Sequence, residues 1–336
     1  MERNVQIIMK NAIQKIAGVI LSITLAFSFT GCNLIAVTNE YNIEQVPETA
    51  FNNTIIRNAA DGYTDKITVL PYEDSVTGLL TKADVKSAIL IDDTNKECLY
   101  SLSGYDRIFP ASMTKVMSGI LIMDALNEGV IQLEDKITLS HNIPLDPDAA
   151  RLDLKMGDTI SVKDLIYGYL IRSLNDCGIV LAEMISGSEA AFVEAMNQKA
   201  YTLGATNTHF VNCHGLHDEN HYTTPYDLYL FFRAFADYDF VKEIDAITEY
   251  TLAYTNAEGK EVTLLIKSTN GFMSGEYNLD SRFELGAWKS GTTKAAGNCL
   301  VMQVFSNNHT YYLVVSGASE REVLYKSMMK MLSTIK

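Results

Sequence analysis

The sequence predicts an α+β domain in which one antiparallel sheet, formed by both ends of the folded region, is covered by helices. Short apolar runs separated by turn residues, typical of strands, occur at residues 87–102 and again at 286–318. The region between them carries apolar residues at helical spacing. Strands on both sides of a helical segment favour a single sheet to which both ends contribute.

The first strand pair begins at Ser87. The run SAILIDD predicts a buried strand, the pair Thr94-Asn95 is turn-like, and KECLYSL predicts a second strand. These residues therefore predict a β-hairpin.

The middle of the chain predicts a series of helices. The clearest start is at Thr224-Pro225-Tyr226-Asp227, which combines an N-cap, a first-turn proline and a capping-box acid. Segments with helix-spaced apolar residues are 113–126, 161–173, 176–187, 189–204 and 225–237.

The last part of the chain returns to strands. Residues 249–268 predict a hairpin around Ala257-Glu258-Gly259. Further strands are expected at 286–292, 297–306 and 309–318, with Asn307-Asn308 at a tight turn, and a helix from Glu320 to Ser333 closes the chain.

Composition excludes several classes of protein. The chain has 336 residues, of which 47% are hydrophobic and 20% charged, enough for a substantial core. With 27 basic and 41 acidic residues the net charge is −14, which argues against nucleic-acid binding. Five cysteines are too few and too scattered for a disulfide scaffold, and their spacing leaves the state of four of them open: Cys98, Cys177, Cys213 and Cys299.

The N-terminal residues predict an export signal. Basic residues precede an apolar run from Ile16 to Phe29, which is shorter than the ~20 residues that span a bilayer. Cys32 follows small residues and resembles the lipidated cysteine of a bacterial lipobox, although Phe29 departs from the usual leucine. An uncleaved anchor or an unmodified cysteine are the alternatives, and each places the rest of the chain outside the cytoplasm.

Three regions follow from these patterns. Residues 1–31 are the expected signal peptide, 32–80 an acidic tether with few apolar positions, and 81–336 the folded domain. We expect the protein on the extracytoplasmic face of the membrane, lipid-anchored through Cys32 or secreted.

Ser112 and Lys115 form an S-x-x-K motif at the start of an apolar helix. Three residues apart on a helix they share one face, so the lysine can serve as base for the serine once its pKa is lowered. The motif alone is weak, because S-x-x-K recurs at Ser327/Lys330 and Ser333/Lys336 in the terminal helix.

Two further short motifs follow in order. Ser173-Leu174-Asn175, an S-x-N motif, lies at a break between two predicted helices, although a helix cap is the ordinary reading of such a triplet. Lys289-Ser290-Gly291-Thr292-Thr293 lies on a predicted strand, where glycine permits close approach and lysine with hydroxyls suits a carboxylate.

The three motifs in this order resemble the active-site set of penicillin-binding proteins and class A β-lactamases. From about Ser87 to Ala318 the chain is most similar to the low-molecular-mass D-alanyl-D-alanine carboxypeptidases. The similarity extends to the blocks FPASMTKVM, SLNDCGIVLAEMISGS, NCHGLHDENHYTTPYDL and WKSGTTKAAGNCLV. It implies a β-lactamase/transpeptidase-like fold for residues 81–336, a serine peptidase acting on peptidoglycan stem peptides, and no cofactor or metal.

The resemblance also implies a role for each motif residue. Ser112 would be acylated, Lys115 would be its base, and Ser173 and Asn175 would relay protons and hold the substrate amide. Lys289 would supply positive charge and lower the pKa of Lys115. The remaining implied roles are substrate binding along the strand by Ser290, Gly291, Thr292 and Thr293, and an oxyanion hole from the backbone N–H groups of Ser112 and Thr292.

The same resemblance implies the partners. Substrates would end in D-Ala-D-Ala, and β-lactams would acylate Ser112. Departures are Ser290 in place of the commoner threonine, and Leu174 and Cys177 beside the second motif. Many relatives continue into a β-rich domain and a membrane helix, and here the lipid on Cys32 is expected to be the anchor.

Other readings remain open. A β-lactamase would need a water-positioning glutamate, for which Glu219 is the nearest loop candidate. A non-catalytic cell-wall scaffold would keep the fold without needing the proton-transfer set. A cross-link endopeptidase would use the same residues. A zinc site is disfavoured because the spacing is not H-E-x-x-H; its candidate ligands are His209, His214, His217, Asp218, Glu219 and His221.

Overall fold

The structure is a computed structural model that describes residues 67–71, 73–75, 78–147 and 149–336. All of these residues belong to the unit that runs from Asp61 to Lys336. The expected signal peptide, Cys32 and most of the expected tether lie outside the described residues, so those three expectations stay predictions.

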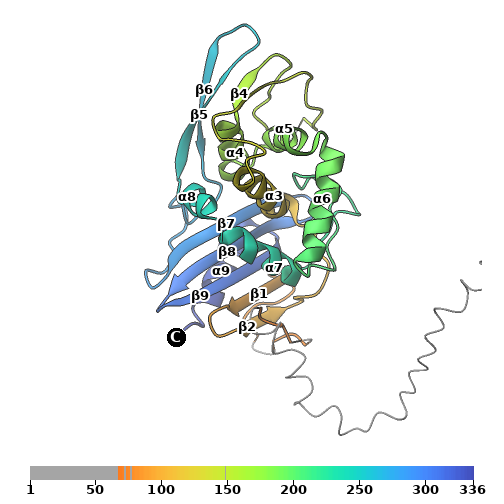
Figure 1. The fold of residues 1–336 in the computed structure, drawn as a ribbon. Helices are drawn as coiled ribbons and strands as arrows, with labels where there is room; N and C mark the ends of the chain where they lie inside the picture. The colour runs from red at the N-terminus through yellow and green to blue at the C-terminus, as the bar shows by residue number, and fades with distance from the viewer. Residues whose placement is uncertain (1–66, 72, 76–77, 148) are drawn as a thin grey trace, which may run out of the picture. The chain divides into compact units, whose positions relative to one another are not determined.

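A five-stranded antiparallel sheet forms the base of the domain (Figure 1). Its order is β2-β1-β9-β8-β7, and Ala88 on the first strand pairs with Val315 on the ninth. The two ends of the folded region therefore meet in one sheet, as the sequence predicts. The strands are β1 (Ser87–Asp92), β2 (Glu97–Leu102), β7 (Glu284–Thr293), β8 (Gly297–Ser306) and β9 (His309–Ala318).

Both faces of this sheet are covered. Successive side chains of a strand point to opposite faces, and on β1 every residue is buried. Leu90 packs in the cluster that contains Met328 of α9 (Arg321–Leu332), whereas Ile89 packs in the cluster of the other helices. The sheet thus divides the apolar core into two layers, and the continuous apolar run SAILID is explained by burial on both faces.

The helical layer lies on the face opposite α9, where α7 packs against the sheet and α3 packs against α7 (Figure 1). All five predicted helical segments are helices, and Thr224 caps α7 by accepting a hydrogen bond from the Asp227 N–H at 3.0 Å. The helices are α3 (Lys115–Asn127), α4 (Val162–Ile171), α5 (Asn175–Ser186), α6 (Glu189–Thr202) and α7 (Pro225–Ala236).

The structure adds elements that the sequence patterns do not predict. A second sheet, in the order β3-β4-β5-β6, contains the predicted hairpin together with two strands of three residues each. Such short strands carry too few residues for a periodic signal. A short helix, α8, also precedes the hairpin. The bounds are β3 (Lys136–Thr138), β4 (Thr159–Ser161), α8 (Asp239–Asp245), β5 (Glu249–Thr255) and β6 (Glu261–Lys267).

The described part of the expected tether packs on the domain. Leu70 and Leu80 are each 4% exposed, and the Thr68 N–H donates to the Tyr229 hydroxyl of α7 at 3.2 Å. These contacts show that the domain includes residues before the expected boundary at residue 81.

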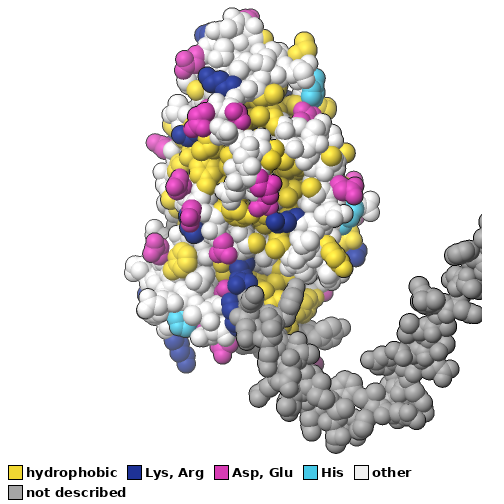
Figure 2. All heavy atoms as spheres, viewed as in Figure 1, with side chains coloured by type: hydrophobic (Ala, Val, Ile, Leu, Met, Phe, Trp, Pro, Cys, Tyr) yellow, Lys and Arg dark blue, Asp and Glu magenta, His cyan; other side chains and the backbone are white. Residues whose placement is uncertain are grey.

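The surface carries charges of both signs. In the view of Figure 2, acidic side chains are spread over the molecule with lysines and arginines among them. This view presents no continuous basic face, in keeping with the net charge of −14. Within the part of the chain that the structure describes, no helix has the length and apolar character needed to cross a bilayer.

Candidate active site

Ser112 lies in a tight turn at the entrance to α3. The 3₁₀ turn η3 (Ala111–Thr114) precedes the regular helix, which begins at Lys115, so the predicted helix starts later than residue 113. Ala111 has a φ of 47°, an unfavourable left-handed conformation for alanine. The other residues of η3 are buried and Ser112 is half-buried. The turn therefore presents the serine at the surface of the site.

Two glycines hold this turn from either side. A Cβ on Gly291 of β7 would meet the Ser112 backbone nitrogen at 2.9 Å and the Pro110 oxygen at 3.0 Å. Gly215, at φ 90°, lies against the Ala111 carbonyl so closely that no side chain would fit. The absence of side chains at these two positions allows the strand and the loop to enclose the serine turn.

Lys115 is the buried centre of the candidate site. Its side chain is 0% exposed, and its Nζ lies 3.2 Å from Ser112 Oγ. The same Nζ donates to Asn175 Oδ1 at 2.6 Å and to the His214 carbonyl at 2.6 Å. One amine thus joins the first motif, the second motif and the loop that contains Gly215.

The surroundings of Lys115 disfavour its charged form. Burial holds the pKa of Lys115 well below its usual value, and the positive charge of Lys289 lowers it further. Behind the lysine, the Tyr169 ring lies 5.1 Å from Nζ. A lysine with a depressed pKa can accept a proton near neutral pH.

The S-x-N motif forms the corner between α4 and α5. Ser173 has a φ of 66°, and its buried Oγ has no hydrogen-bond partner among the described residues. The Leu174 N–H donates to the Gly168 carbonyl at 3.1 Å, and the Asn175 N–H donates to the Ala150 carbonyl at 2.8 Å. A strained serine with an unsatisfied hydroxyl is typical of a site that awaits a ligand.

The third motif lies on β7. Lys289 is 1% exposed, and its Nζ donates to the Ser290 carbonyl at 3.0 Å. Burial lowers the pKa of Lys289 to about 8, while the Asp245 carboxylate raises it. The Ser290 hydroxyl lies 2.7 Å from the Thr269 hydroxyl. β7, which packs against η3, therefore carries a cation and a hydroxyl, and Thr269 from the loop after β6 supplies the second hydroxyl.

Some of the predicted site residues contact one another in the structure, and others have different partners. Lys115 is in direct contact with both Ser112 and Asn175, and Gly291 approaches the Ser112 turn through its backbone. Thr292 is exposed and lies 3.4 Å from Asn298 Oδ1, while Thr293 accepts a hydrogen bond from the Ala296 N–H at the turn into β8.

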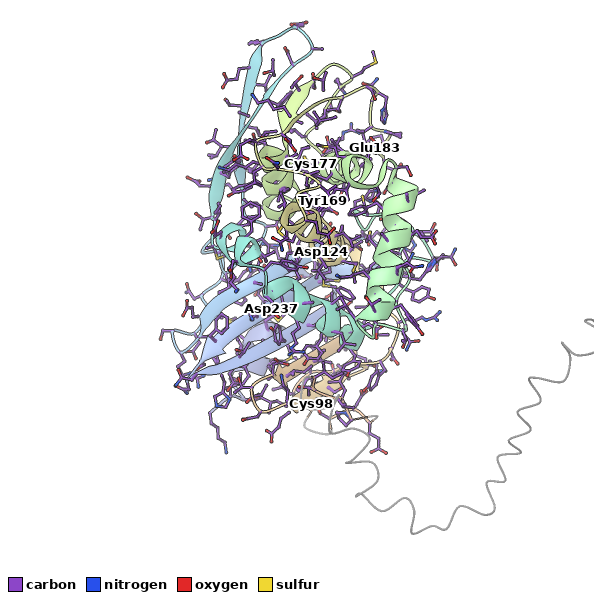
Figure 3. All side chains as sticks on the ribbon, viewed as in Figure 1. Cys98, Asp124, Tyr169, Cys177, Glu183 and Asp237 are labelled. Atoms are coloured by element: carbon purple, nitrogen blue, oxygen red, sulfur yellow. The ribbon has the colours of Figure 1, made fainter. Side chains whose placement is uncertain are left out.

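The sequence patterns do not identify the residues behind Lys115. The Cys213 carbonyl accepts hydrogen bonds from the Ser118 hydroxyl at 2.7 Å and the Tyr169 hydroxyl at 2.6 Å. These bonds fix the backbone one residue before the His214 carbonyl that Lys115 contacts. Figure 3 labels Tyr169 on α4 and Cys177 on α5 within the helical layer. Nothing in the local sequence marks such residues, because their partners are distant in the chain.

The cysteines near the site are unlinked. All four cysteines of the described residues carry free thiols. Burial raises the pKa values of Cys177 and Cys213 well above the ordinary value. Neither thiol is therefore an activated nucleophile.

The histidines of the loop at residues 209–221 have separate partners. The His214 Nε2 lies 3.6 Å from Glu189 Oε1, and the His221 Nε2 lies 2.7 Å from the Thr114 hydroxyl. His217 pairs with Glu219 at 3.3 Å. Among the described residues, no group of three or more histidines, cysteines and acids could hold a metal ion.

Comparison with known proteins assigns the chain to a family. The family model for D-alanyl-D-alanine carboxypeptidase matches residues 75–320, most of the chain. The chain belongs to the D-alanyl-D-alanine carboxypeptidase family. Solved structures share the fold: the penicillin-binding protein D2 of Listeria monocytogenes, solved in an ampicillin-bound form, gives a TM-score of 0.62 at 24% identity and covers 74% of this chain and 96% of that one.

Two curated proteins are similar to this chain. The carboxypeptidase DacF of Bacillus subtilis is 34% identical over 251 residues, which is 74% of this chain and 61% of DacF. A D-alanyl-D-alanine endopeptidase of Escherichia coli is 29% identical over 233 residues, 69% of this chain and 71% of that protein. The chain thus spans about three fifths of the length of DacF. The β-lactamase/transpeptidase-like α+β fold implied by the motifs is confirmed.

Proposed function

We propose that this protein is a serine-type D-alanyl-D-alanine carboxypeptidase that removes the terminal D-Ala from peptidoglycan stem peptides. The observation that carries the proposal is the environment of Lys115, a buried amine 3.2 Å from Ser112 Oγ. Family membership supports the same activity.

The hydrogen bonds of Lys115 suit a neutral base. An uncharged amine has two N–H donors and one lone pair, and Asn175 Oδ1 and the His214 carbonyl take the two donors. The lone pair then faces Ser112 Oγ and can accept its proton. The oxygen attacks the carbonyl carbon of the scissile peptide bond, the C–N bond breaks, and D-Ala leaves with a proton. Water then hydrolyses the acyl-enzyme.

The remaining motif residues suit the two negative charges of this reaction. The backbone N–H groups of Ser112 and Thr292 would stabilise the oxyanion, a role compatible with the close approach of Gly291 to the Ser112 nitrogen. Lys289 and the hydroxyls of β7 would bind the terminal carboxylate of the peptide. Ser173, whose hydroxyl has no described partner, would carry the proton to the leaving amine.

β-Lactams are proposed as covalent inhibitors that acylate Ser112. The Listeria neighbour was solved with ampicillin bound, which supports a similar capacity here. The β-lactamase alternative is less well supported because the side chain of Glu219 is 83% exposed and pairs with His217. A buried, positioned glutamate is what rapid deacylation would need.

The proposal is tested by D-alanine release. A soluble chain starting at Asn33 is incubated with a peptide ending in Lys-D-Ala-D-Ala, in parallel with Ser112→Ala. We expect release by the wild type and none by the variant. A folded wild type that releases no D-alanine would refute the carboxypeptidase, and cleavage of a cross-linked dimer of stem peptides instead would identify an endopeptidase.

We also propose that the protein is held at the extracytoplasmic face of the bacterial membrane by a lipid on Cys32. The support is the signal-like segment before this cysteine. Metabolic labelling with a fatty acid should mark the wild type and not Cys32→Ser, which should appear in the medium or the periplasm. Labelling of both proteins would exclude Cys32 as the lipidated residue.

A further inference from the structure

Asp245 is a buried carboxylate that the proposed chemistry does not use. It is the last residue of α8, and 5% of its surface is exposed. A carboxylate removed from water needs hydrogen-bond donors or a cation nearby to remain ionised. Its neighbours therefore indicate what it does.

Asp245 is joined to β7 at Trp288, the residue directly before Lys289. Its Oδ2 accepts a hydrogen bond from the Trp288 backbone N–H at 2.9 Å, and its carbonyl accepts one from the Trp288 indole N–H at 3.0 Å. β7 is an edge strand of the large sheet. Asp245 thus supplies the acceptor that a neighbouring strand would otherwise provide, at the backbone from which the Lys289 side chain departs.

The side chains of Trp288 and Lys289 lie on opposite faces of β7. Trp288 packs in the apolar cluster on the α9 face of the sheet, and adjacent strand residues point to opposite faces, so Lys289 points toward the helical layer. A shift of Trp288 along the strand would therefore move Lys289 relative to the Ser112 turn. The bonds from Asp245 oppose such a shift because they fix both the backbone and the ring of Trp288.

Asp245 is also the negative charge that acts on Lys289. Burial lowers the pKa of Lys289, and the Asp245 carboxylate opposes this effect. Conversely, burial raises the pKa of Asp245 to about 7, while the Trp288 N–H and Lys289 lower it. Burial disfavours the ammonium form of Lys289, so a compensating negative charge has a physical purpose there.

Other charged groups near α8 are more exposed to solvent. Those on the helix itself and on the end of α7 face solvent, where water and salt screen them, and Tyr167 on α4 is neutral below pH 10. The exposed groups are Asp237, Asp239, Lys242 and Glu243. From α3, Lys115 is the other buried amine, and the positive charge of Lys289 lowers its pKa.

We propose that Asp245 is a positioning residue of the active site, which anchors β7 at Trp288 and supplies the counter-charge that keeps the Lys289 ammonium charged at neutral and mildly alkaline pH. The inference rests on the proposed function, because it requires Lys289 to act as a cation beside Ser112. Asp245 itself touches neither the substrate nor the reacting atoms.

Asp245→Asn separates the two roles. The amide oxygen can still accept from the Trp288 N–H, but the charge is gone. At pH 6.5 the rate constant for acylation of the variant by a fluorescent penicillin should be within about twofold of the wild-type value. At pH 8.5 it should be about tenfold lower than the wild-type value at the same pH, as expected if the pKa of Lys289 drops by about one unit. Asp245→Ala, which also loses the acceptor, should be slower at both pH values.

Glu243→Gln is the matched control, because it removes an equal charge from the exposed side of the same helix. Its pH profile should follow the wild type. Superimposable profiles for the wild type and Asp245→Asn would overturn the inference and leave the carboxypeptidase intact, since D-alanine release by the wild type is measured in the same series. A wild type that neither acylates nor releases D-alanine would overturn both.

A measurement on the wild type covers the case in which Asp245→Asn does not fold. In protein with ¹³C-labelled lysine, the Cε resonance of Lys289 should titrate near pH 8. The ammonium group of Lys289 should therefore still be charged at pH 7. Titration well below pH 7 would show that Asp245 does not sustain the ammonium and would overturn the inference.

Discussion

Two lysines of the site, Lys115 and Lys289, are almost completely buried, and Lys115 lies 3.2 Å from Ser112 Oγ. Burial and mutual repulsion lower the pKa of Lys115 and burial lowers that of Lys289, but their hydrogen bonds differ. Lys115 has two acceptors and the serine, whereas Lys289 has a carbonyl and the charge of Asp245. At the scale of single residues, these surroundings favour a neutral Lys115 and a charged Lys289.

Removing the amine of Lys115 should abolish most acylation. In Lys115→Gln the amide can still donate to Asn175 Oδ1 and the His214 carbonyl, but it cannot accept a proton. We expect acylation of Ser112 by a fluorescent penicillin to fall about 10² to 10⁴-fold, the usual contribution of a general base. The measurement is a time course of labelling on a gel. Lys330→Gln changes the exposed lysine of another S-x-x-K and should label at the wild-type rate.

The pH profile of acylation should have two limbs. The rate should fall as pH drops below the pKa of Lys115, because the amine becomes protonated and can no longer act as base. It should fall again above about pH 8, because Lys289 loses its charge. Burial lowers the pKa values of His214 and His221 to about 3 and about 4, so neither contributes between pH 5 and 9. A rate that keeps rising beyond pH 9 would contradict the role of Lys289.

At the scale of elements, the site depends on close approach between β7 and the η3 turn. Gly291 permits this approach, because a Cβ there would lie about as close to the Ser112 nitrogen as a hydrogen-bond partner does. The loop that contains Gly215 closes the other side of the turn. Two backbone segments thus determine where the serine can lie.

Gly291→Ala should impair acylation more than stability. The new methyl group, 2.9 Å from the Ser112 nitrogen and 3.1 Å from Ala111 Cβ, must push β7 away from the turn and spoil the donor pair of the oxyanion hole. Loss of one such donor lowers the rate about 10² to 10³-fold. Stopped-flow acylation and thermal melts of the same sample separate the two effects. An active Gly291→Ala would mean that the strand does not need this proximity.

Asp176 holds the loop at residues 150–154 over the S-x-N corner. Its carboxylate accepts hydrogen bonds from the N–H groups of Leu152, Asp153 and Leu154 at 2.9, 2.8 and 3.2 Å. In Asp176→Ala these N–H groups lose their acceptor. Their amide hydrogens should therefore exchange faster with solvent, and the rate of Ser112 acylation should fall. Hydrogen exchange measures the first effect. Glu183→Gln, at the other end of α5, is the control, and equal protection in both variants would show that the loop is held by other contacts.

At the scale of the whole molecule, the domain extends further toward the N-terminus than its sequence pattern indicates. Leu70 and Leu80 are buried although they lie in a stretch with few apolar residues. Each would contribute about 1.5–3 kcal/mol if fully buried on folding. The packing of these isolated side chains, rather than local composition, sets the limit of the folded domain.

A chain that starts at residue 81 should therefore be less stable than one that starts at Asp61. We expect its free energy of unfolding to be lower by about 3 kcal/mol, since it lacks Leu70, Leu80 and the bond from Thr68 to Tyr229. Urea denaturation of both chains measures the difference. Leu70→Ala in the longer chain should account for part of it, and equal midpoints would show that residues 67–80 add nothing.

The sequence by itself determined the helices of the middle region, the strands at both ends and the order of the three motifs, because each depends on local periodicity or on adjacent residues. It could not distinguish Ser112/Lys115 from Ser327/Lys330 by the motif alone; only tertiary structure buries Lys115 and leaves Lys330 exposed. The three-residue strands, the packing of Leu70 and the bond from Asp245 to Trp288 were likewise decided by tertiary structure. The physical reason is that burial and hydrogen-bond partners join residues far apart in the chain, and local pattern carries no record of them.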